Sequence, residues 1–284
     1  EIAQCLVGSE MCIRDRMMGA AAIMAGLLTR SLVQPILKMT DDLEHIQENV
    51  PYKELIPFAE SIHSDRLLRE NNEKMRQEFT ANVSHELKTP LTSISGYAEL
   101  IETGIAKPAD VPEFGRKIHV EASRMIQLVN DILQLSHLDN VSESHDSPQM
   151  ETVDLLDVAK ECVERQKVNA QKSFISLTYI GESAPILGNR SLLDELCQNL
   201  CDNAIRYNHP GGKVQLITAC ARDGHCSLTV KDNGIGIPKE AQSSVFERFY
   251  RVDKSRSKAT GGTGLGLAIV KHIARIHNAR IKLE

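Results

Sequence analysis

Tryptophan is absent from this 284-residue chain, and aromatic residues make up only 4% of it, so any hydrophobic core must be mainly aliphatic. No two cysteines have the C-x-x-C spacing typical of redox motifs and zinc sites. Scattered cysteines such as Cys162, Cys220 and Cys226 therefore favour a reducing compartment over a disulfide framework. The net charge is −5, and this lack of basic charge argues against a protein that binds nucleic acid.

Long apolar runs are missing as well. Residues 17–28 (MMGAAAIMAGLL) are uncharged and apolar, but a membrane span needs about 20 residues. The preceding segment, 5–16 (CLVGSEMCIRDR), resembles a translated sequencing adapter, so we set residues 1–16 aside as an artefact; an ordinary N-terminal tail is the alternative. We interpret residues 17–29 as a shortened transmembrane helix, with a buried helix or a signal-peptide core as alternatives. Arg30 and Lys38 then place the downstream chain in the cytoplasm.

Residues 30–78 are polar and amphipathic, with prolines at 51 and 57. They resemble a HAMP-like juxtamembrane linker, although without a clean full-length HAMP pattern. Residues 79–139 contain two apolar stripes at helical spacing on either side of a breaker region, 104–112. The stripes comprise Phe79, Val83, Leu87, Leu91, Ile94, Ala98 and Ile101, then Phe114, Ile118, Ala122, Met125, Leu128, Ile132 and Leu135. Two such helices cannot enclose a core alone, so we expect a helical hairpin that dimerises into a four-helix bundle.

The polar segment 140–150 is interpreted as an interdomain linker. Residues 151–284 then change to a mixed pattern, with helices expected at 155–168, 192–207 and 265–277. Strands are expected at 173–179, 213–221, 225–231 and 279–284, the middle two forming a hairpin. Helices gathered on one side of a mostly antiparallel sheet predict a two-layer α+β sandwich.

The segment FTANVSHELKTPL, residues 79–91, holds the first candidate catalytic group. His85 lies two residues from both Val83 and Leu87, so helical geometry aims it away from the apolar stripe into solvent. Glu86 could orient or deprotonate the imidazole, and Thr89 lies on the same helical face. Taken alone, an exposed histidine is more often plain surface.

The segment CQNLCDNAIRY, residues 197–207, spaces Asn199 and Asn203 so that both amides project from one helical face. Amide oxygens suit a Mg²⁺ ion that already sits on phosphates, and solvated asparagines are the alternative. Cys197 and Cys201 share this spacing, and we interpret them as small buried residues rather than zinc ligands.

Two glycine-rich segments follow. In KDNGIGIP, residues 231–238, Gly234 and Gly236 permit close backbone approach, and Asp232 can accept a hydrogen bond from an adenine amino group; taken alone, the motif is a turn. TGGTGLGLA, residues 260–268, opens the last helix, where free N–H groups and the helix dipole favour phosphate. A dinucleotide-binding loop is the alternative, but that fold places its glycines inside a βαβ unit.

Between these glycine-rich segments lies VFERFYRV, residues 245–252. Phe246 and Phe249 could pack a nucleotide lid formed by residues 253–259, with core packing as the alternative. Arg251 could reach a γ-phosphate.

The five segments together resemble the boxes of two-component sensor histidine kinases, in the family's order. SHELKTPLTSI, residues 84–94, resembles the phosphoacceptor box, and the others resemble the N, G1, F and G2 boxes. The resemblance implies that His85 is phosphorylated from Mg²⁺-ATP with Glu86 as general base. The phosphoryl group would pass to an aspartate on a response-regulator receiver domain, and Thr89 would help position water for dephosphorylation of that regulator.

The resemblance also implies a Bergerat-type (GHKL) ATP-binding domain in a homodimer at the bacterial cell membrane, cytoplasmic from about residue 30 onward. Asn203 would ligate Mg²⁺. The implied nucleotide site comprises Asn199, Asn203, Arg206, Tyr207, Asp232, Gly234, Gly236, Phe246, Phe249, Arg251, Gly262, Thr263, Gly264, Leu265 and Gly266.

The chain departs from the family pattern in reading HNA at 277–279 where two glycines follow the histidine, and in stopping before a further strand. A partner-binding scaffold without ATP use and a cytosolic ATPase of the wider fold group are the rival interpretations.

Overall fold

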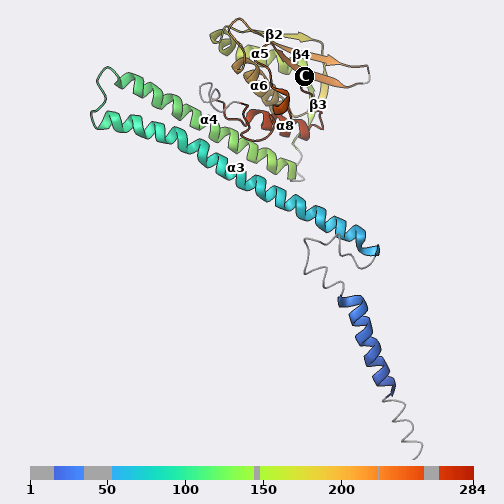
Figure 1. Cartoon of the computed structure of the whole chain (residues 1–284). Helices are drawn as coiled ribbons and strands as arrows, with labels where there is room; N and C mark the ends of the chain where they lie inside the picture. The colour runs from blue at the N-terminus through green and yellow to red at the C-terminus, as the bar shows by residue number, and fades with distance from the viewer. Residues whose placement is uncertain (1–15, 35–52, 144–147, 223, 253–261) are drawn as a thin grey trace, which may run out of the picture. The chain divides into compact units, whose positions relative to one another are not determined.

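The computed structural model describes residues 16–34, 53–143, 148–222, 224–252 and 262–284 (Figure 1). Two compact units make up the chain, Glu1–Glu78 and Phe79–Glu284. Several predictions concern residues outside the described ranges: most of the suspected adapter, residues 35–52 of the juxtamembrane linker, residues 144–147 of the interdomain linker, and the lid segment 253–259.

The first unit contains a helix over residues 16–28 that continues as a π-helix, η1 (Thr29–Val33). A 3₁₀ turn, η2 (Lys53–Leu55), leads into the long helix α3 (Ile56–Glu102). Apolar side chains of residues 17–28 lie open to solvent, and Ile23 is 67% exposed. Among the described residues, no helix combines the length and the apolar character needed to cross a bilayer.

In the second unit, α3 and α4 (Val111–Glu143) run side by side as the predicted helical hairpin (Figure 1). The rings of Tyr97 and Phe114 lie 5.3 Å apart across the two helices. Gly104, with φ +69°, supplies the left-handed residue that ends α3. The expectation of a linker from residue 140 is wrong for residues 140–143, because α4 continues through them.

The rest of the unit contains two small sheets and the helices that pack on them. β1 (Glu151–Asp154) pairs antiparallel with β3 (Pro185–Gly188), and β2 (Ser176–Gly181) lies parallel to β4 (Lys213–Cys220). β4 pairs antiparallel with β5 (Cys226–Asp232), which confirms the predicted hairpin. The sequence missed β1 and β3, which are four residues each and too short to show an alternating pattern. The strand expected at 279–284 is wrong, because no described strand pairs with these residues.

Helices α5 (Leu155–Lys172) and α6 (Arg190–Arg206) pack on β2, β4 and β5, and α8 (Gly266–Ile276) packs on α6. This arrangement confirms the predicted two-layer α+β sandwich. The core between sheet and helices is mainly aliphatic and includes Val158, Ala159, Cys162, Cys197, Cys201, Val214 and Leu216, each at most 1% exposed.

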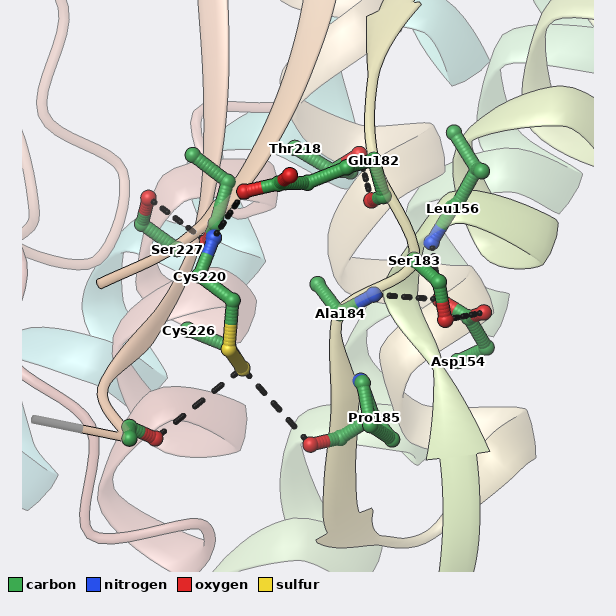
Figure 2. The surroundings of a disulfide bond; sticks show 12 residues. Asp154, Leu156, Glu182, Ser183, Ala184, Pro185, Thr218, Cys220, Cys226 and Ser227 are labelled. Carbon is green, nitrogen blue, oxygen red and sulfur yellow. Dashed lines mark hydrogen bonds between the residues drawn. A yellow bond between two sulfur atoms is a disulfide. The ribbon is translucent and has the colours of Figure 1, made fainter. Parts of the chain in front are cut away.

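Side-chain caps fix where the helices begin. The Asp154 carboxylate accepts hydrogen bonds from the Leu156 N–H at 2.9 Å, the Ser183 hydroxyl at 2.6 Å and the Ala184 N–H at 2.8 Å (Figure 2). The Ser183 bond and the two backbone bonds hold the pKa of Asp154 below its ordinary value. Asp154 therefore ties the start of α5 to the chain entering β3.

Asn278 follows α8 with a left-handed φ of +51°. The Ala279 N–H reaches back to the Ala274 carbonyl at 2.8 Å, as in a helix-ending motif. Asparagine tolerates this conformation better than other non-glycine residues, so the replacement of the family's glycine is compatible with the local turn.

The cysteine prediction is wrong for one pair. Cys220 and Cys226 form a disulfide across the end of the β4–β5 hairpin, with Cα atoms 4.1 Å apart (Figure 2). They are directly opposite in the strand register, and the close Cα spacing is that of a pair without backbone hydrogen bonds between them. Pairing of strands brings together residues that look isolated in sequence. The other described cysteines, Cys162, Cys197 and Cys201, are free and buried.

Candidate functional site

His85 lies exposed on α3, as its helical spacing predicts. An open hollow of about 390 Å³ adjoins it, lined by His85, Lys88, Thr89, Thr92 and Ser93. The Thr89 hydroxyl donates to the His85 carbonyl at 3.2 Å, so Thr89 is held against the same turn. The imidazole is thus accessible from solvent on the face that it shares with Thr89.

The neighbouring Glu86 is half-buried and faces two arginines. Arg251 Nη2 lies 3.0 Å from Glu86 Oε2, and Arg124 Nη2 lies 3.8 Å from the same oxygen. Arg251 comes from the segment before the glycine-rich turn, and its side chain is only 6% exposed. In this conformation Arg251, which the sequence suggested for a γ-phosphate, is instead an ion-pair partner of the residue beside His85.

The two asparagines of α6 meet the start of α8. A Cβ added to Gly266 would lie 2.9 Å from Asn199 Oδ1 and 3.7 Å from Asn203 Nδ2. The Asn199 amide donates to the Glu195 carbonyl at 3.1 Å. A side chain at position 266 would crowd the Asn199 amide, and Asn203 lies within ordinary contact distance. The structure thus brings both predicted asparagines against the predicted glycine-rich turn.

A second contact joins the end of α6 to the same turn. A Cβ on Gly262 would lie 3.1 Å from both Arg206 Nη1 and the Tyr207 hydroxyl. The Ile235 N–H donates to the Tyr207 carbonyl at 3.1 Å, which draws in the first glycine motif. In that motif the Gly234 N–H donates to Asp232 Oδ1 at 2.8 Å, and Gly236 adopts a left-handed φ of +68°. Phe246 is half-buried, and no contact between it and the glycine motifs is described.

The segment before the lid also touches the glycine-rich turn. The Phe249 N–H donates to the Gly264 carbonyl at 2.9 Å, and a Cβ on Gly264 would lie 3.0 Å from Phe249 Cα. The Phe249 ring lies 5.7 Å from that of Phe79 on α3. The α6 segment and the Phe249 segment thus contact the turn at residues 262–266, and the Asp232 motif joins them through Tyr207.

Sequence reasoning missed the residues by which α4 binds this region. The Thr263 hydroxyl donates to Asp131 Oδ2 at 2.6 Å, and Gln127 Nε2 donates to Asp131 Oδ1 at 2.7 Å. Burial raises the pKa of Asp131, although the two hydrogen bonds oppose that effect. The sequence held one sign of this contact: Asp131 places a carboxylate on the apolar face of α4, between Leu128 and Leu135.

A second polar contact lies near the end of α4. Arg248 Nη2 donates to both carboxylate oxygens of Asp139, at 2.8 and 2.9 Å. His272 Nε2 lies 3.4 Å from Asp139 Oδ1. Burial lowers the pKa of His272 more than the nearby Asp139 carboxylate raises it, which favours the neutral imidazole.

Between these polar contacts lies an apolar cluster, which we call the α4–α8 cluster. Its buried members are Leu128, Leu135 and Leu138 of α4 and Leu265, Ile269 and Ile273 at α8. Three of the seven residues of the second predicted stripe, Leu128, Ile132 and Leu135, therefore pack in this cluster. On another face of α4, Ile126, Val129 and Leu133 remain 63%, 42% and 64% exposed.

Glu195 of α6 carries a further carboxyl near this cluster; the residue is half-buried and its Oε1 atom is buried. Desolvation raises its pKa to about 7, a hydrogen bond with Gln134 opposes the shift, and the Asp131 charge adds to it. Oε1 of Glu195 has no hydrogen-bond partner among the described residues. The contact between α4 and the sandwich thus contains two carboxyls that burial shifts upward in pKa.

Both halves of the second unit match known families. Residues 75–141 match the family model "His Kinase A (phospho-acceptor) domain", and residues 188–284 match "Histidine kinase-, DNA gyrase B-, and HSP90-like ATPase". "Sensor-like histidine kinase SenX3" of Mycolicibacterium smegmatis is 42% identical over 230 residues, which cover 80% of this chain and 58% of that protein. "Signal transduction histidine-protein kinase BaeS" of Escherichia coli is 34% identical over 92% of this chain and 56% of its own length. The chain thus spans somewhat more than half the length of these relatives.

Among solved structures, the histidine kinase AdeS of Acinetobacter baumannii superposes with a TM-score of 0.54 at 26% identity, covering 68% of this chain and 86% of that one. With both family models matched in order along one chain, and with relatives of this kind over most of its length, the chain belongs to the two-component sensor histidine kinases.

Proposed function

We propose that the protein phosphorylates its own His85 from ATP and passes the phosphoryl group to an aspartate of a response regulator. The observation that carries the proposal is that the N-box amides and Tyr207 meet the glycine-rich turn at residues 262–266, while the Asp232 motif meets Tyr207, in the same unit as an exposed His85.

The geometry around residues 262–266 suits a phosphate chain. Glycines let a phosphate approach the backbone closely before α8, and the helix dipole favours negative charge there. Arg251 Nε is buried without a hydrogen-bond partner among the described residues, which is the state expected of a donor that awaits a ligand. Arg206 and Tyr207 flank Gly262, where they could contact the nucleotide.

Bound Mg²⁺ would neutralise charge on the phosphates. Asn203 is the residue proposed to hold it, with Asn199 beside it, because an amide oxygen is a suitable neutral ligand. No group of three or more His, Cys, Asp or Glu side chains in the described ranges is arranged to hold a metal. A magnesium ion at this place would therefore depend on the nucleotide for most of its ligands.

At His85, an imidazole nitrogen lone pair would attack the γ-phosphorus while the bond to the β-phosphate oxygen breaks and ADP leaves. The proton on the other ring nitrogen would go to Glu86, the proposed general base. Glu86 Oε2 is paired with Arg251 at 3.0 Å, and release of this ion pair would make the carboxylate a stronger base. Arg251 would then be free to turn toward the γ-phosphate, so one side-chain movement frees both groups.

In the second step, a carboxylate oxygen of the regulator's aspartate would attack phosphorus while the bond between phosphorus and nitrogen breaks. The open hollow on the His85 face, with Thr89 in its lining, leaves room for that partner. Thr89 is proposed to position water when the regulator is dephosphorylated. The solved structure of histidine kinase ThkA in complex with response regulator TrrA, 21% identical with a TM-score of 0.53, shares the fold.

Dimerisation through the hairpin is proposed from the second apolar face of α4. Ile126, Val129 and Leu133 follow helical spacing and are exposed in the single chain. A second copy would bury them in a four-helix bundle. Membrane attachment through residues 17–28 is likewise proposed, because their exposed apolar side chains need cover. Domain limits at 30–78, 79–139 and 151–284 are proposed with them.

The test is incubation of the purified chain with Mg²⁺ and γ-labelled ATP. We expect acid-labile label on wild-type protein and none on His85→Gln, with unchanged ATP affinity in the variant because His85 lies outside the glycine-rich site. His137→Gln is the matched control, since this exposed histidine lies on α4. Equal labelling of wild type and His85→Gln would refute the proposal. Transfer is then tested with a separate receiver domain.

A further inference from the structure

The buried carboxylate of Asp131 reaches from α4 to the glycine-rich turn. Asp131 is 8% exposed and Thr263 is also 8% exposed. Their hydrogen bond, at 2.6 Å, joins residues 132 positions apart. The remaining carboxylate oxygen accepts from Gln127 at 2.7 Å. Asp131 is therefore fully engaged, and its contact with the turn passes through one hydroxyl group.

That hydroxyl has a single hydrogen. Thr263 donates it to Asp131 Oδ2, while its oxygen accepts from the Leu265 N–H at 3.4 Å. A bond from a hydroxyl to an ionised carboxylate is stronger than one to a neutral acceptor. While this bond persists, Thr263 has no hydrogen left for a phosphate oxygen.

The carboxylate also acts through its charge. It lies beside the turn that is proposed to take phosphates, and like charges repel most strongly where water is excluded. A leucine would satisfy the apolar stripe between Leu128 and Leu135 without the cost of desolvating a charge. The presence of a carboxylate at this position therefore needs a reason other than packing.

We propose that Asp131 is a positioning residue that competes with the nucleotide phosphates for the Thr263 hydroxyl. The inference rests on the proposed function, namely that residues 262–266 bind the phosphates of ATP. With α4 docked, the turn is held by Asp131 and nucleotide binds less tightly; nucleotide binding in turn weakens the docking of α4. Such coupling is reciprocal by thermodynamic necessity. A movement of α4 would thereby alter nucleotide affinity.

The experiment measures the dissociation constants of ADP and of a non-hydrolysable ATP analogue, with Mg²⁺, on the whole chain. Asp131→Asn keeps the shape but removes the charge and weakens the bond, so we expect analogue binding to tighten about 3- to 10-fold. In the Thr263→Val background the same change should tighten binding less, because only the effect of the charge remains. Glu113→Gln is the matched control and should leave binding unchanged, because it removes a carboxylate of the same helix that is 57% exposed and pairs with Arg116 and Lys117.

A second measurement needs no nucleotide. Hydrogen exchange of the α8 amides reports on docking, and we expect Asp131→Asn and Thr263→Val each to accelerate it about 3- to 10-fold. The double variant should be no faster than either single variant, since both remove one bond.

Additive effects on exchange would overturn the proposal. Unchanged or weaker analogue binding in Asp131→Asn would also overturn it. Equal tightening by Asp131→Asn with threonine and with valine at position 263 would overturn it too, because that is the result expected if the charge acts alone. If the wild type takes no label at His85 while the binding results for the Asp131 variants are as expected, the kinase proposal is refuted and the competition for the Thr263 hydroxyl is not.

Discussion

The proposed phosphoacceptor, His85, and the proposed nucleotide site at residues 262–266 differ in how the fold holds them: the first is open to solvent and the second is braced by its neighbours. His85 lies exposed, and the Thr89 hydroxyl donates to its backbone carbonyl, not to its ring. The glycine-rich turn is braced by α6, by the segment around Phe249 and by Asp131 of α4. A group that must meet two phosphoryl partners in turn needs access, whereas a phosphate site gains from donors that are already in place.

The strongest test of this contrast is deletion of buried apolar volume on α4. Leu135 is 0% exposed in the α4–α8 cluster, so Leu135→Ala should cost about 2–5 kcal/mol of unfolding free energy and speed hydrogen exchange in α8. Urea unfolding and exchange measured together would check this.

The control for that variant lies on the same helix. Leu133 is 64% exposed, so Leu133→Ala should leave exchange in α8 unchanged and act only on self-association. If both variants loosen α8 equally, the two faces of α4 do not have separate roles.

The next effect concerns pH. Because burial raises the pKa of Glu195 from its ordinary 4.5 to about 7, the folded state holds this proton more tightly than the unfolded chain. The resulting stability is fully present below about pH 4.5 and is lost as the pH rises to about 7. Glu195→Gln should therefore match the wild type at low pH and exceed it by about 1–3 kcal/mol at pH 8.

Chemical unfolding across that pH range measures the difference. Glu164→Gln is the control, because this carboxylate is 67% exposed and makes only a long contact with Lys167. A Glu195→Gln curve parallel to the wild type at every pH would contradict the assignment of this titration.

A smaller effect is expected at the turn itself. Gly264 has φ +75°, and an added Cβ would lie 3.0 Å from the backbone of Phe249, so Gly264→Ala should cost about 1–2 kcal/mol and weaken nucleotide binding. Gly104→Ala has a similar φ of +69° but open space around it. It should cost about 1 kcal/mol and leave nucleotide affinity unchanged. Calorimetric titration with ADP separates the two.

The smallest effect is at the partly exposed ion pair. Arg248 and Asp139 are 35% and 32% exposed, so a double-mutant cycle with alanine at both should give a coupling of about 0.5–1 kcal/mol. The pair Lys117 and Glu113, within one turn of α4 and more exposed, should give less. A larger coupling for Lys117 and Glu113 than for Arg248 and Asp139 would mean that an ion pair between α4 and the sandwich is no stronger than one on the surface of a helix.

Much of the fold could be predicted because the periodicities are local. The α4 stripe, the β4–β5 hairpin and the start of α8 each follow from residues close in sequence. The short strands β1 and β3 could not be predicted, since their residues become a sheet only by pairing with each other. The disulfide was missed for a related reason, because Cys220 and Cys226 are partners only once the hairpin register is set.

The candidate site divides in the same way. The sequence by itself determined which residues carry donors, glycine freedom and an accessible imidazole, since these are properties of residue type and spacing. Only the tertiary structure decided that Arg251 meets Glu86 and that Asp131 meets Thr263. Both contacts join residues more than 130 positions apart, and no local pattern encodes which of several polar side chains will meet when two apolar faces pack together.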